Sequence, residues 1–120
     1  MDVDKRLVIE RVKIDDTLDA EREMELIGAD SRGIAIMRDK AVFRVVKVHD
    51  VPLRAANLLK QIFLSKGGEA AVSRGTAAMT VEQTDVLLMG TIAIYRASIE
   101  SMREQPFGLK ALADELVNFL

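Results

Sequence analysis

The sequence predicts an α/β protein of the two-layer α+β type, with about four strands in a mixed sheet and helices packed on it. Residues 41–48 form an almost continuous apolar run that is typical of a buried strand. Apolar residues then recur at positions 55, 58, 59, 62 and 63, the spacing of one helix face. Gly67-Gly68 ends that helix before a second strand begins at Glu69. A strand, a helix and a strand in this order predict a parallel, right-handed βαβ unit.

Length and composition place the chain in the ordinary globular class. Its 120 residues, 49% of them hydrophobic, predict a single domain spanning residues 1–120. A formal charge of −2 argues against a nucleic-acid partner, which normally requires a basic excess. The absence of cysteine excludes disulfides, thiolate catalysis and zinc–thiolate sites. No apolar run approaches the roughly 20 residues of a membrane span, and residues 1–5 do not resemble a signal peptide, so we expect a cytoplasmic protein without a membrane partner.

The N-terminal third begins with a predicted strand. Residues 6–14 are rich in β-branched side chains, and Asp16 or Thr17 can cap a helix over residues 18–27 that Gly28 ends. Six acidic residues lie between Asp15 and Glu25. Because no His or Asn is interleaved at ligand spacing, a solvated helix face is favoured over a metal or partner site.

A second short helical element follows Asp30, and five basic residues lie between Arg32 and Lys47. These cations indicate either an anion-binding face or basic side chains on the open side of a strand, and the second interpretation is favoured. We expect the strand 41–48 to be central or near-central in the sheet. Pro52 suits the first turn of the helix that follows.

The C-terminal half predicts two more strands and two more helices. Residues 69–75 and 86–89 are the expected strands, joined by a loop over residues 76–83. A helix carries Ile92 to Met102, residues 105–108 break it, and a last amphipathic helix runs nearly to Leu120. The apolar C-terminus predicts docking on the chain's own sheet, on a second copy, or on a following domain.

His49 is the only histidine, and Asp50 follows it at the end of the predicted strand. Asp50 could orient His49 for acid–base chemistry, but adjacent strand residues point in opposite directions. No serine, thiol or second histidine lies close in sequence to complete a catalytic set. A structural or surface histidine is therefore favoured over a catalytic one.

The best candidate for a small-ligand site combines two strand ends. Backbone amides where Gly90-Thr91 leads into a helix could bind a phosphate-like anion. If the sheet brings these strand ends together, the segment 73–75 would add a hydroxyl and a guanidinium, and Lys60 could reach the ligand from the helix. The candidate residues are Ser73, Arg74, Gly75, Gly90, Thr91 and Lys60. No Walker or dinucleotide-binding glycine motif is present, and glycines needed only for turns and close packing are the favoured alternative.

Four blocks of sequence carry a family resemblance. They are residues 57–61 (Asn-Leu-Leu-Lys-Gln), 66–75 (Lys-Gly-Gly-Glu-Ala-Ala-Val-Ser-Arg-Gly), 84–91 (Thr-Asp-Val-Leu-Leu-Met-Gly-Thr) and 105–109 (Gln-Pro-Phe-Gly-Leu). Together they resemble the N-terminal extension that precedes the pterin-binding barrel in dihydropteroate synthase proteins of many anaerobic bacteria and some archaea. Residues 33–45 are similar to the same extension, so the resemblance covers nearly the whole chain.

The resemblance implies a context in folate and pterin biosynthesis. It implies no catalytic residue, because the (β/α)₈ barrel, which takes about 250 residues, and its pterin motifs are absent. Three hypotheses follow: a non-catalytic accessory domain, a sensor of a phosphate- or pterin-like anion, and a small enzyme using His49 and Asp50. The first is favoured, with a pterin-binding barrel or a second copy as partner, and we expect no cofactor and no activity of the chain alone.

Overall fold

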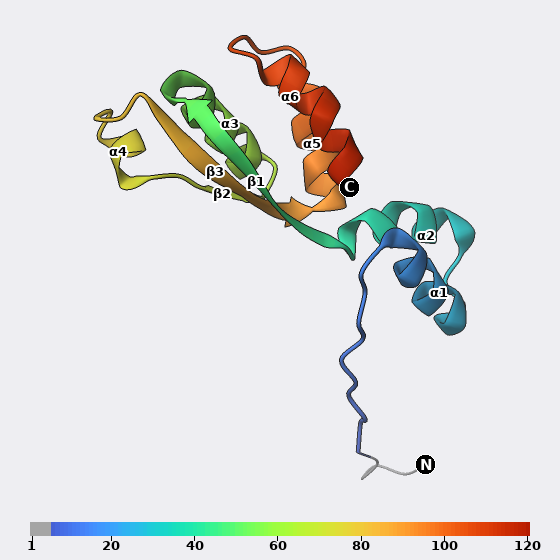
Figure 1. Cartoon of the computed structure of the whole chain (residues 1–120). Coiled ribbons are helices and arrows are strands. Elements are labelled where there is room, and N and C mark those ends of the chain that lie inside the picture. The colour runs from blue at the N-terminus through green and yellow to red at the C-terminus, as the bar shows by residue number, and fades with distance from the viewer. Residues whose placement is uncertain (1–5) are drawn as a thin grey trace.

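The computed structural model describes residues 6–120 of the chain. The main body is a three-stranded sheet with helices on one side, and two short helices form a smaller lobe beside it (Figure 1). The smaller lobe contains α1 (Thr17–Ile27), α2 (Ser31–Met37) and a 3₁₀ turn, η1 (Arg38–Lys40). The body contains β1 (Phe43–Pro52), α3 (Leu53–Ser65), β2 (Glu69–Ala71), α4 (Arg74–Ala77), β3 (Gln83–Thr91), α5 (Ile92–Met102), α6 (Leu109–Leu116) and η2 (Val117–Phe119).

The strand order is β1-β3-β2, and both neighbouring pairs are antiparallel. The α/β class is confirmed, but the prediction of about four strands in a mixed sheet is wrong. β1 and β2 run in the same direction, as the predicted βαβ unit requires, yet β3 lies between them. The expectation that the strand 41–48 is central is therefore also wrong, because β1 is an edge strand and β3 is the central one.

The predicted fourth strand, residues 6–14, is extended but pairs with no strand of the described chain. Its β-branched composition favours extended backbone, whereas a strand also requires a partner, which local sequence does not supply. We call residues 6–14 the N-terminal arm. Its base is fixed to the start of β1, because Arg44 Nη1 donates to the Asp15 carbonyl oxygen at 2.9 Å.

Most helix boundaries agree with their sequence signals. Asp16 caps α1 by accepting a hydrogen bond from the Asp19 amide at 2.8 Å, and Gly28 ends α1 in the left-handed region with φ of +86°. Gly67 has φ of +90° after α3, as predicted. The expected loop over residues 76–83 differs, since its beginning belongs to the four-residue helix α4.

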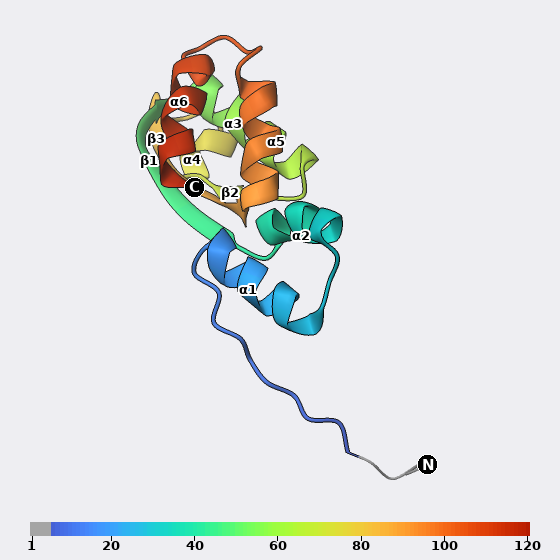
Figure 2. The same ribbon diagram turned by 90° about the vertical axis from the view of Figure 1, so that its right-hand side faces the viewer.

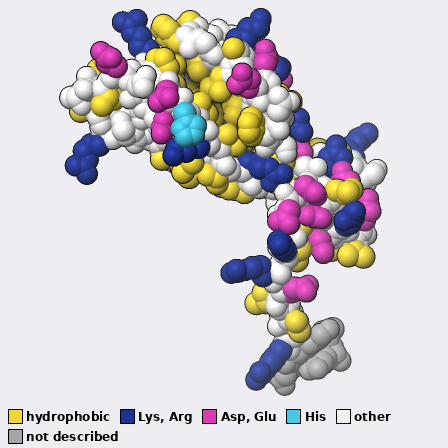
Figure 3. Space-filling model, viewed as in Figure 1, with side chains coloured by type: hydrophobic (Ala, Val, Ile, Leu, Met, Phe, Trp, Pro, Cys, Tyr) yellow, Lys and Arg dark blue, Asp and Glu magenta, His cyan; other side chains and the backbone are white. Residues whose placement is uncertain are grey.

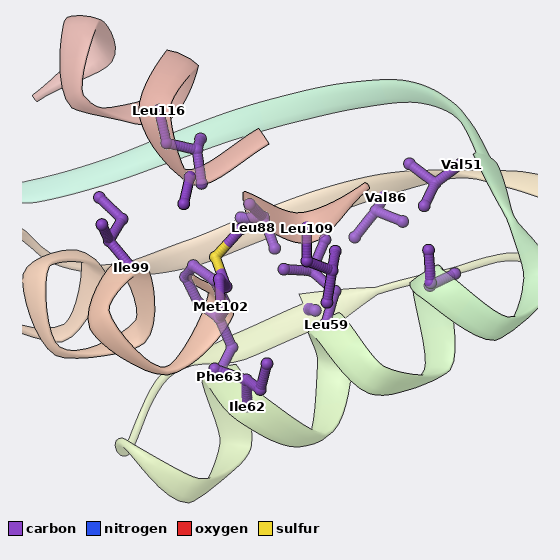
Figure 4. Close-up of a cluster of buried hydrophobic side chains, with 14 of the residues drawn as sticks. Val51, Leu59, Ile62, Phe63, Val86, Leu88, Ile99, Met102, Leu109 and Leu116 are labelled. Carbon is purple, nitrogen blue, oxygen red and sulfur yellow. The ribbon is translucent and has the colours of Figure 1, made fainter. Parts of the chain in front are cut away.

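The core lies between the sheet and α3, α5 and α6, and its side chains come from all of these elements (Figure 4). Tyr95 is fully buried at its centre, where its ring meets Phe63 edge-on at 5.2 Å and its hydroxyl lies within 3.0 Å of the carbonyl oxygens of Arg44 and Leu88. A second, smaller cluster of Ala20, Val42 and Ile92 joins the two-helix lobe to the body. That residues 1–120 fold as one domain remains a prediction.

Two side-chain ion pairs also link the elements around η1. Arg38 pairs with Glu21 of α1, and Arg96 Nε lies 3.0 Å from Asp39 Oδ2. Part of the acidic run on α1 is thus used in capping and ion pairing. Among residues 6–120, no group of three or more His, Asp or Glu side chains is arranged to hold a metal ion. No helix in this part of the chain is long and apolar enough to cross a membrane.

Candidate functional site

The segment 73–75, half of the predicted anion site, forms a turn at one end of the sheet. Ser73 donates its amide to Thr84 Oγ1 at 3.0 Å, and its hydroxyl lies 3.1 Å from Thr76 Oγ1. At Gly75 a Cβ would lie 2.5 Å from Val81 Cγ1, so only glycine fits the turn without a shift. Arg74 begins α4 with an exposed side chain.

The other half, Gly90-Thr91, lies at the opposite end of β3. Six residues of extended strand separate Gly90 from Thr84, which corresponds to roughly 20 Å. A Cβ at Gly90 would lie 2.9 Å from Ile94 Cγ2, and Thr91 Oγ1 caps α5 by accepting from the Ile94 amide at 3.2 Å. The structure therefore does not bring the two halves together, and close packing and capping account for both residues.

Lys60, the remaining candidate, contacts the edge of β2. Its Nζ donates to the Ala70 carbonyl oxygen at 3.0 Å and lies 3.9 Å from Glu69 Oε1. Glu69 Oε1 in turn accepts from the Ala70 amide at 2.9 Å. Lys60 thus supports the short strand β2 and lies apart from Gly90-Thr91. Ligand binding by any of the six candidates stays a prediction, and the geometry above does not gather them around one ligand position.

His49 and Asp50 form a β-bulge. Val48 pairs with Val86 and Val51 pairs with Thr84, so His49 and Asp50 together lie opposite the single residue Asp85. The bulge shifts the alternation of β1 by one residue and thereby turns Val51 into the core. Asp50 has φ of +54°, a conformation uncommon for residues other than glycine.

The polar groups at the bulge point to β3 and not to each other. Asp85 Oδ1 accepts from the Asp50 amide at 3.0 Å, and Asp85 Oδ2 lies 3.6 Å from His49 Nδ1. The Asp50 amide, followed by the nearby charges of His49 and Lys47, lowers the pKa of Asp85 despite partial desolvation. Because His49 and Asp50 are both exposed and unpaired with one another, the geometry does not support a His49–Asp50 catalytic pair.

Asp85 is the residue that the sequence analysis missed at the bulge. Asp85 lies directly before the expected strand 86–89, and the sequence analysis gave it no role. A signal existed in the spacing Val46, Val48, Val51, since a change from two to three residues between apolar positions is typical of a bulge.

Within residues 6–120, the second face of the sheet carries none of the buried core residues. The helices α3, α5 and α6 all lie on one side of the strands (Figure 2). Strand alternation places both apolar and charged side chains on the other side, which we call the open face: Phe43, Val45 and Lys47 of β1, Asp85, Leu87 and Met89 of β3, and Glu69 and Ala71 of β2. Phe43 and Val45 are 59% and 56% exposed. Exposed apolar side chains grouped on one sheet face are typical of a surface for association.

A shallow groove runs along β1 beside α6, with a volume of about 290 Å³. Its apolar floor comes from Val46, Val48, Leu112, Leu116 and Phe119. Lys47, His49 and Glu115 lie at its rim. Hydrophobic side chains gather beside the single histidine in the region of this groove (Figure 3). The groove and the open face thus flank the two sides of the same edge strand.

Comparison with known proteins finds two relatives that share most of this chain. A probable bifunctional folylpolyglutamate synthase/dihydropteroate synthase of Halobacterium salinarum is 36% identical over 103 residues, which is 86% of this chain and 12% of that protein. A bifunctional dihydropteroate synthase/dihydropteroate reductase of Helicobacter pylori is 32% identical over 97 residues, 81% of this chain and 26% of that protein. The chain therefore spans about an eighth and about a quarter of these relatives.

No family model and no solved structure matches the chain. The similarity to part of two proteins whose names include dihydropteroate synthase agrees with the resemblance found in the sequence. It concerns a minor part of each relative.

Proposed function

We propose that this chain is a non-catalytic accessory domain of dihydropteroate synthase-type proteins and acts in folate biosynthesis. The observation that carries the proposal is the coverage of the relatives, since over four-fifths of this chain matches only 12% of one relative and 26% of the other. The remaining three-quarters of the Helicobacter pylori protein has room for a (β/α)₈ barrel of about 250 residues. A chain matching only the smaller part is expected to work beside such a barrel.

The open face supports this role because it supplies a surface for docking. A two-layer fold whose sheet has one covered side leaves the other side to be covered by a partner. Phe43 and Val45 are exposed there, and Leu87 and Met89 continue the surface across the central strand. We propose that residues 1–120 fold as one unit and that the open face packs against a pterin-binding barrel.

The site geometry gives further support to a non-catalytic role. Two polar side chains selected as chemical candidates are used in local structure, since Thr91 caps α5 and Lys60 binds the β2 edge. Asp85, found only in the structure, holds the bulge. The anion-sensor alternative required a pocket joining residues 73–75 to residues 90 and 91, and these lie at opposite ends of β3.

The test is binding of the purified chain to the dihydropteroate synthase barrel encoded by the same organism, followed by sedimentation velocity. We expect a complex with the unaltered chain and loss of at least tenfold in affinity for Val45→Lys, which places a charge on the open face. Gln61→Lys is the matched control, because Gln61 is exposed on α3, away from that face. Undiminished binding by Val45→Lys would exclude the open face, and absence of any complex would contradict the accessory role.

A further inference from the structure

The N-terminal arm exposes apolar side chains without a contact that explains them. Leu7, Val8 and Ile9 are 89%, 95% and 93% exposed, and the arm extends away from the body (Figure 1). Three adjacent apolar residues in extended backbone are the composition of a strand rather than of a solvated tail. The base of the arm is fixed, because Ile14 packs against the cluster of Ala20, Val42 and Ile92. The arm is therefore anchored at its base and extends away from the body, where it can pair with another strand.

The two edges of the sheet differ in their capacity to accept a strand. On β2, which has three residues, the Ala70 amide and carbonyl already bond to the side chains of Glu69 and Lys60. β1 has ten residues, and the described chain places no strand on its outer side. An unblocked edge of this length is a template for strand addition. The part of the arm before its fixed base is short enough to pair along this edge.

One antiparallel register makes the two sequences complementary. With Glu10 opposite Lys47, Val12 lies opposite Val45 and Val8 reaches His49. The pairs on the open face then include one acid–base pair and one apolar pair, the combinations that stabilise neighbouring strands. The pairing ends at Val12, because Ile14 packs in its own chain and Lys13 would lie opposite Arg44. A shift of the arm by two residues would place Glu10 opposite Val45 and Val8 opposite Lys47. Because this shift pairs each charged residue with an apolar one, the side-chain pattern favours the first register.

The other side of the arm suits the groove between β1 and α6. In the same register Ile9 lies opposite Val48, whose side chain forms part of the apolar floor. Arg11 lies opposite Val46, and the acidic Glu115 lines that groove. Over residues 9–12 both faces of the arm thus meet apolar or oppositely charged side chains. The added strand would also extend the open face with Val8 and Val12 and leave it uncovered.

We propose that the arm pairs as a fourth, antiparallel strand with the β1 edge of a second copy of this chain, and that two copies exchange arms reciprocally. The occupant is a second copy because the arm points away from its own sheet, and within residues 6–120 each copy carries an arm and a β1 edge that pair with no further strand. Reciprocal exchange closes the assembly at two chains, since both edges are then occupied. This pairing does not depend on the proposed docking to a barrel.

The first test measures the dimer dissociation constant by sedimentation equilibrium of the full chain. Glu10→Lys and Lys47→Glu each place like charges opposite one another twice per dimer, and each is expected to weaken the dimer about tenfold. The double variant Glu10→Lys/Lys47→Glu restores opposite charges and is expected to return the constant to within about threefold of the original. A monomer at all concentrations, or a double variant no tighter than the singles, would overturn the proposal.

The second test separates exchange from folding of the arm onto its own sheet. The chain has no cysteine, so Val12→Cys/Val45→Cys introduces one reactive pair at exposed positions. A short thiol-reactive cross-linker is expected to join two chains, seen as a doubled mass under denaturing conditions. The control Val12→Cys/Ala71→Cys carries its second thiol on the β2 edge, where no cross-link is expected. An intrachain cross-link in the first variant would assign the arm to its own β1 edge and refute the exchange.

Discussion

The two faces of β3 differ in burial although their side chains are alike. Val86 and Leu88 are fully buried under the helices, whereas Leu87 and Met89, their sequence neighbours, are only half-buried on the open face. All four are large apolar residues, so composition does not distinguish the faces. What distinguishes them is the packing of α3 and α5 against one side only (Figure 2). The covered face stabilises the fold, and the open face stays partly exposed to solvent.

The largest expected effect on stability comes from truncating one side chain on each face of β3. Leu88→Ala removes a fully buried side chain and should lower the free energy of unfolding by about 3 kcal/mol through lost burial and a residual cavity. Leu87→Ala, one residue away on the open face, should lower it by less than about 1 kcal/mol. Urea unfolding of both variants measures the difference. Equal losses would mean that the open face is covered in the isolated chain.

A second effect concerns Tyr95 under the covered face. Burial raises the pKa of Tyr95 to about 12, although the Val46 backbone and Arg44 act in the opposite direction. The folded state therefore keeps its proton above pH 10, where the unfolded state loses it, and stability should decline as pH rises from about 10 toward 12. The expected loss is on the order of 1–2 kcal/mol.

Because Tyr95 is the only tyrosine and the chain has no tryptophan, phenolate absorbance reports this one group. The absorbance should titrate near pH 12 in the folded chain and near pH 10 in urea. Tyr95→Phe should show a flatter decline of stability over the same range, and an unchanged decline would assign the effect to other groups.

The third effect comes from a buried hydroxyl without a partner. Ser98 of α5 is fully buried, and its Oγ makes no hydrogen bond within the described chain. Removing an unpaired buried polar group avoids its desolvation penalty, so Ser98→Ala should raise the free energy of unfolding by up to about 1 kcal/mol. Ser101→Ala, at a half-buried position three residues later, should change it by less than about 0.5 kcal/mol. A marked loss with Ser98→Ala would indicate a bonded hydroxyl.

The covered face was more predictable from sequence than the open one. The helical spacing of α3 identified Ala55, Leu59, Ile62 and Phe63, all of which are buried, because one helix face records its burial locally. The apolar run in β1 led to the wrong prediction of a central strand. Phe43 and Val45 are apolar although they lie exposed on the open face of an edge strand. No local pattern distinguishes an apolar side chain that helices bury from one that stays on the open face.

The residues of the candidate anion site are not brought together, and the reason is topological. Carboxyl ends of parallel strands meet at one edge, and the anion site assumed that arrangement for the ends of β2 and β3. In the antiparallel pair the end of β2 instead lies beside the start of β3, where Ser73 bonds to Thr84. Strand order is set by long-range packing, so the glycines could be placed at turns from sequence but not relative to one another.

The smallest expected effect belongs to Asp85, an acidic residue of the open face. The Asp50 amide and the charges of His49 and Lys47 lower the pKa of Asp85 from 3.8 in the folded state. Its contribution to stability is therefore present above pH 4 and is lost as pH falls through the lower folded value. The side chain is exposed, so solvent screens these interactions and the contribution should be slight.

NMR titration of the Asp85 carboxyl carbon should give a pKa below 3.8. That pKa should rise toward 3.8 in the double variant Lys47→Ala/His49→Ala, which removes two of the groups that lower it. An Asp85 pKa at or above 3.8 in the unaltered chain would show that the bulge does not form as described, whereas the stability of the covered face would be unaffected.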